Sequence, residues 1–239
     1  MATTHTADPL GSAISDYWQG NHTVEVQVFT DQADEDVLPV SYLFRTLAEM
    51  PEREQLALSL CQGKVLDVGA GAGSHALALQ EKGLTVTALE ISAKACATMQ
   101  ARGVDKVVCA DFFKATPQPH NTLLLLMNGI GLAGTLDNLP LFLETCKKWL
   151  APGGHLLLES SDILYLYEEE DGSVLVDLNG DYYGELTYVM QYKKEQTAPF
   201  PWLFIDFGLL QEFAEKAGFN AELIREEEDH HYLARLSLQ

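Results

Sequence analysis

The residues whose types and spacing are best suited to chemistry begin with a glycine-rich turn. The segment DVGAGAG places Gly69, Gly71 and Gly73 just after Asp67, at the end of the apolar run 64–68. Glycine in a strand-to-helix turn lets a ligand approach the backbone where any Cβ would collide. The amides of the following helix then face that ligand. We therefore expect a binding site at this turn.

Two acidic residues follow at the ends of the next two apolar runs. Glu90 closes one run, and Asp111, followed by Phe112, closes the other. A carboxylate at the first position suits the two hydroxyls of a ribose. An acid beside an aromatic ring suits the amine and the edge of a purine. Because the carboxyl ends of parallel strands share one edge of a sheet, these positions predict a nucleoside site.

The elements that must position these residues alternate along the chain. Apolar runs at 64–68, 85–90, 106–110, 122–127 and 155–160 are typical of buried strands. Helix signals separate them: Ser74 to Gly83, Ser92 to Gly103, and a segment at 139–150 that Asn138 and Pro140 open. Strands alternating with helices predict a doubly wound, Rossmann-like α/β fold with right-handed crossovers.

The last third predicts an antiparallel closure of the same sheet. We expect strands at 183–192 and 232–238, with a helix between them that begins at Asp206 and ends at Gly218. The expected sheet has seven strands and is mostly parallel, with a reversed C-terminal edge hairpin. Turn signals such as Asp171-Gly172 predict an inserted hairpin near 163–185.

We interpret the chain as one domain. Residues 1–63 form an N-terminal helical cover and linker, with an exposed linker at 31–38 and a helix between Pro51 and Gly63. Residues 64–239 form the core.

Charge and composition exclude several classes of protein. Fifteen Lys and Arg residues against 35 Asp and Glu residues give a net charge of −20. Nucleic-acid binding draws on Lys and Arg, so a nucleic-acid partner is not expected. The start of the chain does not resemble a secretory signal, and no apolar stretch is long enough to span a membrane. The 4 cysteines lack metal-like spacing, which favours reduced thiols, a cytoplasmic location and no bound metal.

The glycine turn differs from the dinucleotide fingerprint, which requires glycine or alanine at the position of Ser74. The segments KVLDVGAGAGSHALALQ, VTALEIS, CADFF, LLLLMNGIG and LAPGGHLLLE instead resemble the class I S-adenosylmethionine-dependent methyltransferases. The tail around EFAEKAGF is similar to their closing hairpin. The resemblance implies S-adenosylmethionine as cofactor and S-adenosylhomocysteine as product.

The resemblance also implies roles for individual residues. Asp67 and the turn would lie along the methionine portion of the cofactor, and Glu90 would hold the ribose. Asn128 would lie near the sulfonium and the acceptor. Tyr42 and Arg45 are candidates for the cofactor carboxylate. The complete set implied to bind cofactor is Asp67, Gly69, Ala70, Gly71, Gly73, Glu90, Ile91, Asp111, Phe112, Asn128, Gly129, Tyr42 and Arg45.

The acceptor is expected to be a small molecule. The motif N-P-P-[YF], which similar enzymes use on amide and base nitrogens, is replaced by Asn128-Gly129-Ile130-Gly131. Asn128 and Asp162, just past the fifth strand, are the catalytic or acceptor-contact candidates. We interpret His75 as a packed or capping residue, and Asp229-His230-His231 as a solvated end.

Three functions fit this sequence. The first is methyl transfer from S-adenosylmethionine to a small molecule. The second is a non-catalytic, S-adenosylmethionine-binding partner protein, and the third is a nucleotide-dependent oxidoreductase. The sequence leaves open the acceptor and its nucleophilic atom, the use of a base, and the oligomeric state.

Overall fold

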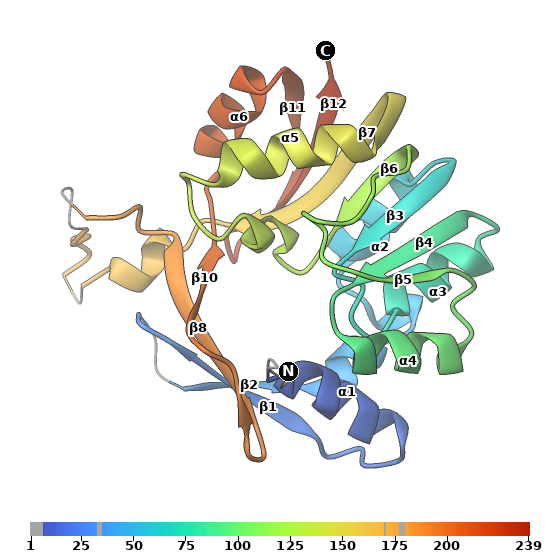
Figure 1. The fold of residues 1–239 in the computed structure, drawn as a ribbon. Helices are drawn as coiled ribbons and strands as arrows, with labels where there is room; N and C mark the ends of the chain where they lie inside the picture. The colour runs from blue at the N-terminus through green and yellow to red at the C-terminus, as the bar shows by residue number, and fades with distance from the viewer. Residues whose placement is uncertain (1–6, 33–34, 170, 177–179) are drawn as a thin grey trace, which may run out of the picture.

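A computed structural model describes residues 7–32, 35–169, 171–176 and 180–239. Within these residues, a seven-stranded sheet has the strand order β11-β12-β7-β6-β3-β4-β5. Strands β3 to β7 run parallel, β12 is antiparallel to β7, and β11 is antiparallel to β12. The predicted α/β sheet with its reversed C-terminal hairpin is confirmed (Figure 1). The strands are β3 (Lys64–Val68), β4 (Thr85–Glu90), β5 (Val107–Cys109), β6 (His120–Leu125), β7 (Leu150–Ser161), β11 (Phe219–Glu226) and β12 (His231–Leu238).

The central strands are apolar on both faces because helices cover both sides of the sheet. In β6, Leu123 and Leu125 pack into one apolar cluster and Leu124 into the other, which is the alternation expected of a strand. Helices α5 (Leu139–Trp149) and α6 (Phe207–Lys216) supply the first cluster. Helices α2 (Glu52–Leu60), α3 (Ser74–Glu81) and α4 (Ala93–Arg102) supply the second.

Side-chain caps form at two of the residues expected to start helices, Ser92 and Asp206, but not at Ser74 or Asn138. Ser92 accepts a hydrogen bond from the Ala95 amide, and Asp206 accepts one from the Leu209 amide. Ser74 is instead the first residue of α3, and its hydroxyl donates to the Leu43 carbonyl at 2.7 Å. Gly73 occupies the cap position with a left-handed φ of 85°.

A second, antiparallel sheet corrects two sequence predictions. Its strand order is β10-β8-β1-β2, and β9 pairs with β8. The strand expected at 183–192 is β8, and it pairs with β1 rather than closing the main sheet, whose edge β11 occupies. The expected linker at 31–38 includes the start of β2, while residues 33–34 lie outside the described chain. The strands are β1 (Glu25–Thr30), β2 (Asp36–Pro39), β8 (Glu185–Tyr192), β9 (Glu195–Gln196) and β10 (Phe200–Leu203).

The N-terminal part of the chain contributes helices, in addition to strands β1 and β2, to the cover over the carboxyl edge of the main sheet. Helix α1 (Pro9–Trp18) is capped by Asp8, packs beside α4, and lies between it and the second sheet (Figure 1). The 3₁₀ helices η1 (Val40–Phe44) and η2 (Leu47–Glu49) connect β2 to α2.

The segment expected to hold an inserted hairpin contains η4 (Leu164–Tyr167) and a single antiparallel bridge between Glu168 and Val174. Part of that prediction falls on residues 170 and 177–179, which lie outside the described chain.

Candidate functional site

The three glycines of the turn serve two different purposes: two leave open space, and the third allows close helix packing. Gly69 and Gly71 have φ values of 70° and 55°, which favour glycine. A Cβ at Gly69 would meet no described atom within 4 Å, and one at Gly71 would meet only the Gly69 carbonyl, at 4.0 Å. A Cβ at Gly73 would come within 2.9 Å of Met99. Gly69 and Gly71 therefore leave space for a ligand, whereas Gly73 lets α3 pack closely.

Glu90 joins the turn to the end of β4. One carboxylate oxygen accepts from the Gly71 amide at 2.9 Å, and the other accepts from the Ser92 amide at 2.8 Å. A carboxylate has about four lone-pair positions, so both oxygens retain acceptor capacity. Glu90 also lines both cavities that adjoin the turn. Its position thus suits a ligand with two neighbouring hydroxyls.

The first of these cavities, of about 490 Å³, suits a nucleoside. It extends from Glu90 past Ile91 and Phe112 to the start of α1. Ile91 is 70% exposed, which offers an apolar surface beside the strand ends. Phe112 is largely buried and stacks on Trp149, with 6.0 Å between ring centroids.

Asp111 lines the same cavity, but its carboxylate already has partners. One oxygen accepts from the Phe113 amide at 2.9 Å, and the other pairs with Lys114 at 2.7 Å. These contacts hold the carboxylate in place and lower its pKa, chiefly through the hydrogen bond from Lys114. Asp111 is therefore an ionised acceptor at the edge of the cavity.

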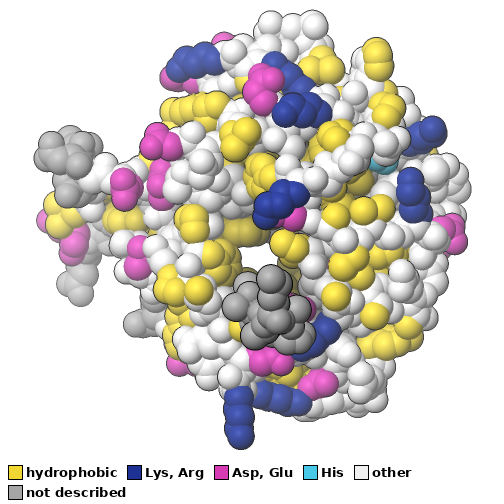
Figure 2. Space-filling view, in the orientation of Figure 1, with side chains coloured by type: hydrophobic (Ala, Val, Ile, Leu, Met, Phe, Trp, Pro, Cys, Tyr) yellow, Lys and Arg dark blue, Asp and Glu magenta, His cyan; other side chains and the backbone are white. Residues whose placement is uncertain are grey.

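The second cavity, of about 390 Å³, lies between the glycine turn and the second sheet. Its walls include Arg45, Asn128 and the inward side chains of β1, β2, β8 and β10. Figure 2 shows the molecule hollowed at its centre, with hydrophobic side chains around the opening. The two cavities share the turn, Glu90 and Trp202. One elongated ligand can therefore occupy parts of both.

Arg45 carries unused hydrogen-bond donors at this junction. Its Nη2 donates to both oxygens of Glu54, each at 3.0 Å, and its guanidinium lies 3.3 Å from the centre of the Tyr42 ring. Its Nε and Nη1 are buried and have no partner among the described residues. Buried polar groups are normally satisfied. The N–H bonds of Nε and Nη1 point in different directions, so each can donate one charge-assisted hydrogen bond to a ligand oxygen, for example of a carboxylate.

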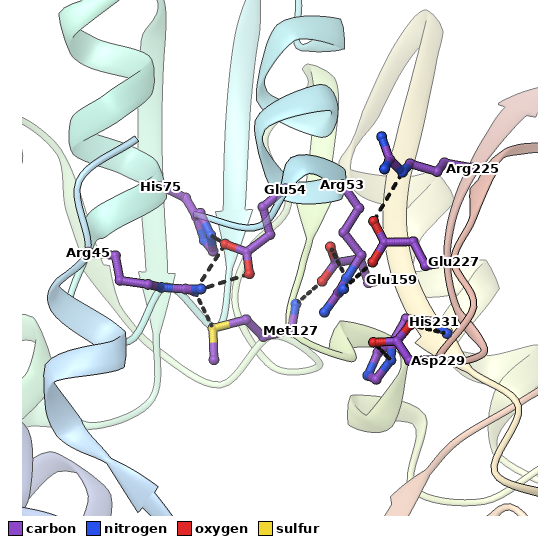
Figure 3. A network of polar contacts seen from close by, with 10 residues as sticks. All are labelled: Arg45, Arg53, Glu54, His75, Met127, Glu159, Arg225, Glu227, Asp229 and His231. Carbon is purple, nitrogen blue, oxygen red and sulfur yellow. Dashed lines mark hydrogen bonds and ion pairs between the residues drawn. The ribbon is translucent and has the colours of Figure 1, made fainter. Parts of the chain in front are cut away.

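Glu54 organises the polar side of this cavity, and sequence analysis missed it. It is fully buried on α2 and also contacts Nε2 of His75 at 2.8 Å (Figure 3). Burial would raise the pKa of Glu54, but His75 and Arg45 together lower it. Burial would likewise lower the pKa of His75, but Glu54 and Asp67 outweigh it and raise the pKa. The set therefore favours an ionised Glu54 between two cationic partners.

Two further carboxylates lie beneath the cavity. Burial raises the pKa of Asp67 to about 6, and one of its oxygens has no partner among the described residues. Burial raises the pKa of Glu159 to about 7. Glu159 accepts from the Met127 amide at 2.7 Å and lies 3.3 Å from Nε of Arg53 (Figure 3). It thereby holds Met127, which has a left-handed φ of 55° and lines the cavity.

The two catalytic candidates from the sequence have different outcomes. Asn128 lines the second cavity with Gly129. Its amide donates to the Leu203 carbonyl at 3.1 Å, and its Oδ1 is buried without a partner in the described chain. Asp162 lines neither cavity; it accepts from the Leu164 amide and from the Tyr183 hydroxyl. These two hydrogen bonds tie Asp162 to η4 and to Tyr183.

The fold is that of a Rossmann-like protein, and its cavities at the carboxyl ends of the strands have a shape and lining that suit a nucleoside. Comparisons with known proteins identify the family. A family profile described as "Methyltransferase domain" matches residues 66–158. The chain is 45% identical to a SAM-dependent methyltransferase from Bacteroides fragilis, solved in complex with S-adenosyl-L-homocysteine. That match covers 97% of this chain and 95% of the other, with a TM-score of 0.91. This protein therefore belongs to the SAM-dependent methyltransferases.

More distant structures share the fold. The CcbJ methyltransferase from Streptomyces caelestis is 16% identical, over 82% of this chain and 99% of that one, with a TM-score of 0.59. The structure of a DhpI–SAH complex is 18% identical over 98% of both chains, with a TM-score of 0.55. A search of curated proteins found no match.

Two features are absent from residues 7–32, 35–169, 171–176 and 180–239. None of their helices is long and apolar enough to cross a membrane. They also contain no cluster of three or more His, Cys, Asp or Glu side chains that could hold a metal ion.

Proposed function

We propose that this protein binds S-adenosylmethionine across the two cavities and transfers its methyl group to a small-molecule acceptor. The observation that carries the proposal concerns Nε and Nη1 of Arg45, two buried donors with no partner among the described residues, which lie beside the open space at Gly69 and Gly71. The cofactor supplies an activated methyl group on a cationic sulfur. The protein's contribution is to bind and orient.

The proposed binding mode assigns one part of the cofactor to each region. Ile91, Asp111 and Phe112 hold the adenine in the larger cavity, and Glu90 holds the ribose hydroxyls. Arg45, supported by Glu54 and Tyr42, holds the carboxylate. Asp67 lies beneath this end of the site, and one of its carboxylate oxygens has no partner in the described part of the chain, which suits the amino group of the methionine portion.

The acceptor then enters from the second sheet. The smaller cavity continues past Asn128 to Tyr188 and Phe204, where no part of the proposed cofactor lies. A cavity of about 390 Å³ that also holds one end of the cofactor has room for a small molecule rather than a polymer. The net charge of −20 also disfavours a nucleic acid. Holding acceptor and methyl group in line provides most of the rate enhancement expected here.

Thermal unfolding with added ligands tests the binding step. S-adenosylmethionine and S-adenosylhomocysteine should each raise the melting temperature, and NAD should not, because ligands that bind only the folded state stabilise it. Release of S-adenosylhomocysteine during incubation with a panel of metabolites tests the transfer step. Folded protein that shows no shift at millimolar cofactor would refute the proposal.

A further inference from the structure

The second sheet presents one continuous face to the smaller cavity. Val28 of β1 pairs with Asp36 of β2 on one side and with Met190 of β8 on the other, so these three side chains form a row across the sheet. All three line the cavity, as does Tyr188, which lies two residues before Met190 on β8. Alternate residues of a strand share a face, which explains this arrangement. Asp36 therefore adds a carboxylate to an otherwise apolar wall.

Aromatic rings form the rest of this wall, and the main domain fixes their position. The centroid of the Tyr188 ring lies 6.3 Å from those of Trp202 and Phe204. Trp202 rests directly on the backbone of Gly131, where an added Cβ would lie 2.1 Å from the indole. Gly131 belongs to η3 (Gly129–Ala133), the turn that Asn128 opens. The aromatic wall is therefore held beside Asn128, where the acceptor is proposed to bind.

The charges around this cavity are predominantly negative. The carboxylates of Asp36, Asp67 and Glu90 line it. Among the described lining residues, Arg45 and His75 are the cationic side chains, and Glu54 already engages both. Aromatic faces and carboxylates both attract cations, whereas an anionic acceptor would find no free cationic side chain in this wall.

We propose that the acceptor is a small amine, methylated on nitrogen, with its ammonium product held by Tyr188, Trp202, Phe204 and Asp36. This inference rests on the proposed function. The amine nitrogen uses its lone pair to form the new bond to the methyl carbon as the carbon–sulfur bond breaks. The electron pair of that bond stays on sulfur, and the positive charge passes to nitrogen. A primary or secondary amine then releases its proton to Asp36 or to water.

The wall favours an amine acceptor because of how the charge on the acceptor changes during methyl transfer. Positive charge grows on the acceptor nitrogen as the methyl group is transferred, next to rings and a carboxylate that stabilise it. An anionic oxygen acceptor would instead be neutralised during transfer, so this wall would bind it poorly and gain nothing as the reaction proceeds. The same surface thus favours nitrogen over an anionic oxygen, both in binding and in the reaction.

Binding of a quaternary ammonium probe tests the proposal. Choline and its uncharged isostere 3,3-dimethylbutan-1-ol are titrated calorimetrically into protein saturated with S-adenosylhomocysteine, which blocks the cofactor site. Choline should bind at least about tenfold more tightly than the alcohol. Equal affinities, or no binding of choline, would overturn the amine assignment.

Substitutions of individual residues test whether choline binds at the proposed wall. Trp202→Leu should weaken choline binding by about tenfold and Asp36→Asn by about threefold, and Asp36→Asn, which lies outside the larger cavity, should leave the affinity for S-adenosylhomocysteine unchanged. Asp36 is exposed at the cavity mouth, so its variant keeps the test valid if Trp202→Leu does not fold. Glu25→Gln, on the same sheet but outside both cavities, is the matched control. If S-adenosylhomocysteine itself fails to bind, the proposed function fails; if only the discrimination fails, the amine assignment fails alone.

Discussion

Replacing Arg45 by lysine keeps the positive charge and removes the guanidinium donors, so it separates the two contributions. Lysine keeps a cation beside the fully buried Glu54, so the variant avoids leaving that carboxylate unpaired. It cannot reproduce both fixed donors, Nε and Nη1, that now have no partner in the described chain. We expect the variant to fold and to bind cofactor weakly.

The magnitude follows from the bonds that are lost. Each charge-assisted hydrogen bond contributes roughly 1.5–3 kcal/mol, and lysine can replace about one of the two. The expected loss is therefore about 2–3 kcal/mol, which corresponds to an affinity for S-adenosylhomocysteine that is about 30- to 150-fold weaker.

Isothermal titration calorimetry gives the affinity, and urea unfolding without ligand gives the stability. Arg53→Lys is the matched control, because Arg53 is also buried and paired with carboxylates but lines neither cavity. The control should lose some stability and keep the wild-type affinity. Wild-type affinity in Arg45→Lys would refute the assignment of Arg45 to the cofactor carboxylate.

Three further predictions concern the turn, the ribose contact and a buried acid. Gly71→Val should abolish binding of S-adenosylhomocysteine by calorimetry, whereas Gly83→Val, which imposes similar strain at a positive φ outside both cavities, should lower only the melting temperature. Glu90→Gln should weaken that binding about tenfold, because the amide turns a donor towards the Gly71 or Ser92 amide and loses charge; an unchanged Kd would remove the ribose assignment. Because the pKa of Glu159 is about 7 in the folded protein and ordinarily 4.5, the folded state binds this proton more tightly, and the wild type loses about 3 kcal/mol of stability as the pH rises from 4.5 to 8. Glu159→Gln should not show that loss in urea titrations across this pH range, and parallel curves for the two proteins would contradict the shift.

The main sheet was predictable because its signals are local. Strand β3 and strand β4 have the bounds expected from their apolar runs, since both faces of each are covered by helices. The helix starts at Ser92 and Asp206 were also predicted correctly, because a capping side chain contacts a backbone amide only a few residues away. The glycine turn was predictable for the same reasons, because it directly follows an apolar strand run and directly precedes a helix start.

The second sheet was not predictable, because its pairing is remote. Strand β8 alternates as a half-exposed strand should, but alternation does not indicate which sheet a strand joins. Its partner β1 lies in the first thirty residues, and Gln27 faces Gln191 across the pair. The aromatic wall of the acceptor cavity depends on that pairing, so the sequence did not predict the wall either.

Glu54 illustrates the same limit for a single side chain. In the sequence it is one of several charged residues in a helix, which is typical of a solvated face. Its burial depends on contacts with Arg45 and His75, which come from two other elements. His75, expected as a packed or capping residue, is packed against Glu54 and also lines the cavity.

The most direct test of the central claim is a crystal structure of the complex with S-adenosylhomocysteine. The account predicts the ribose hydroxyls at Glu90, the carboxylate hydrogen-bonded to Nε or Nη1 of Arg45, and the sulfur directed past Asn128 towards Trp202. A nucleoside bound away from the glycine turn, or a carboxylate that leaves the Arg45 donors unpaired, would contradict it.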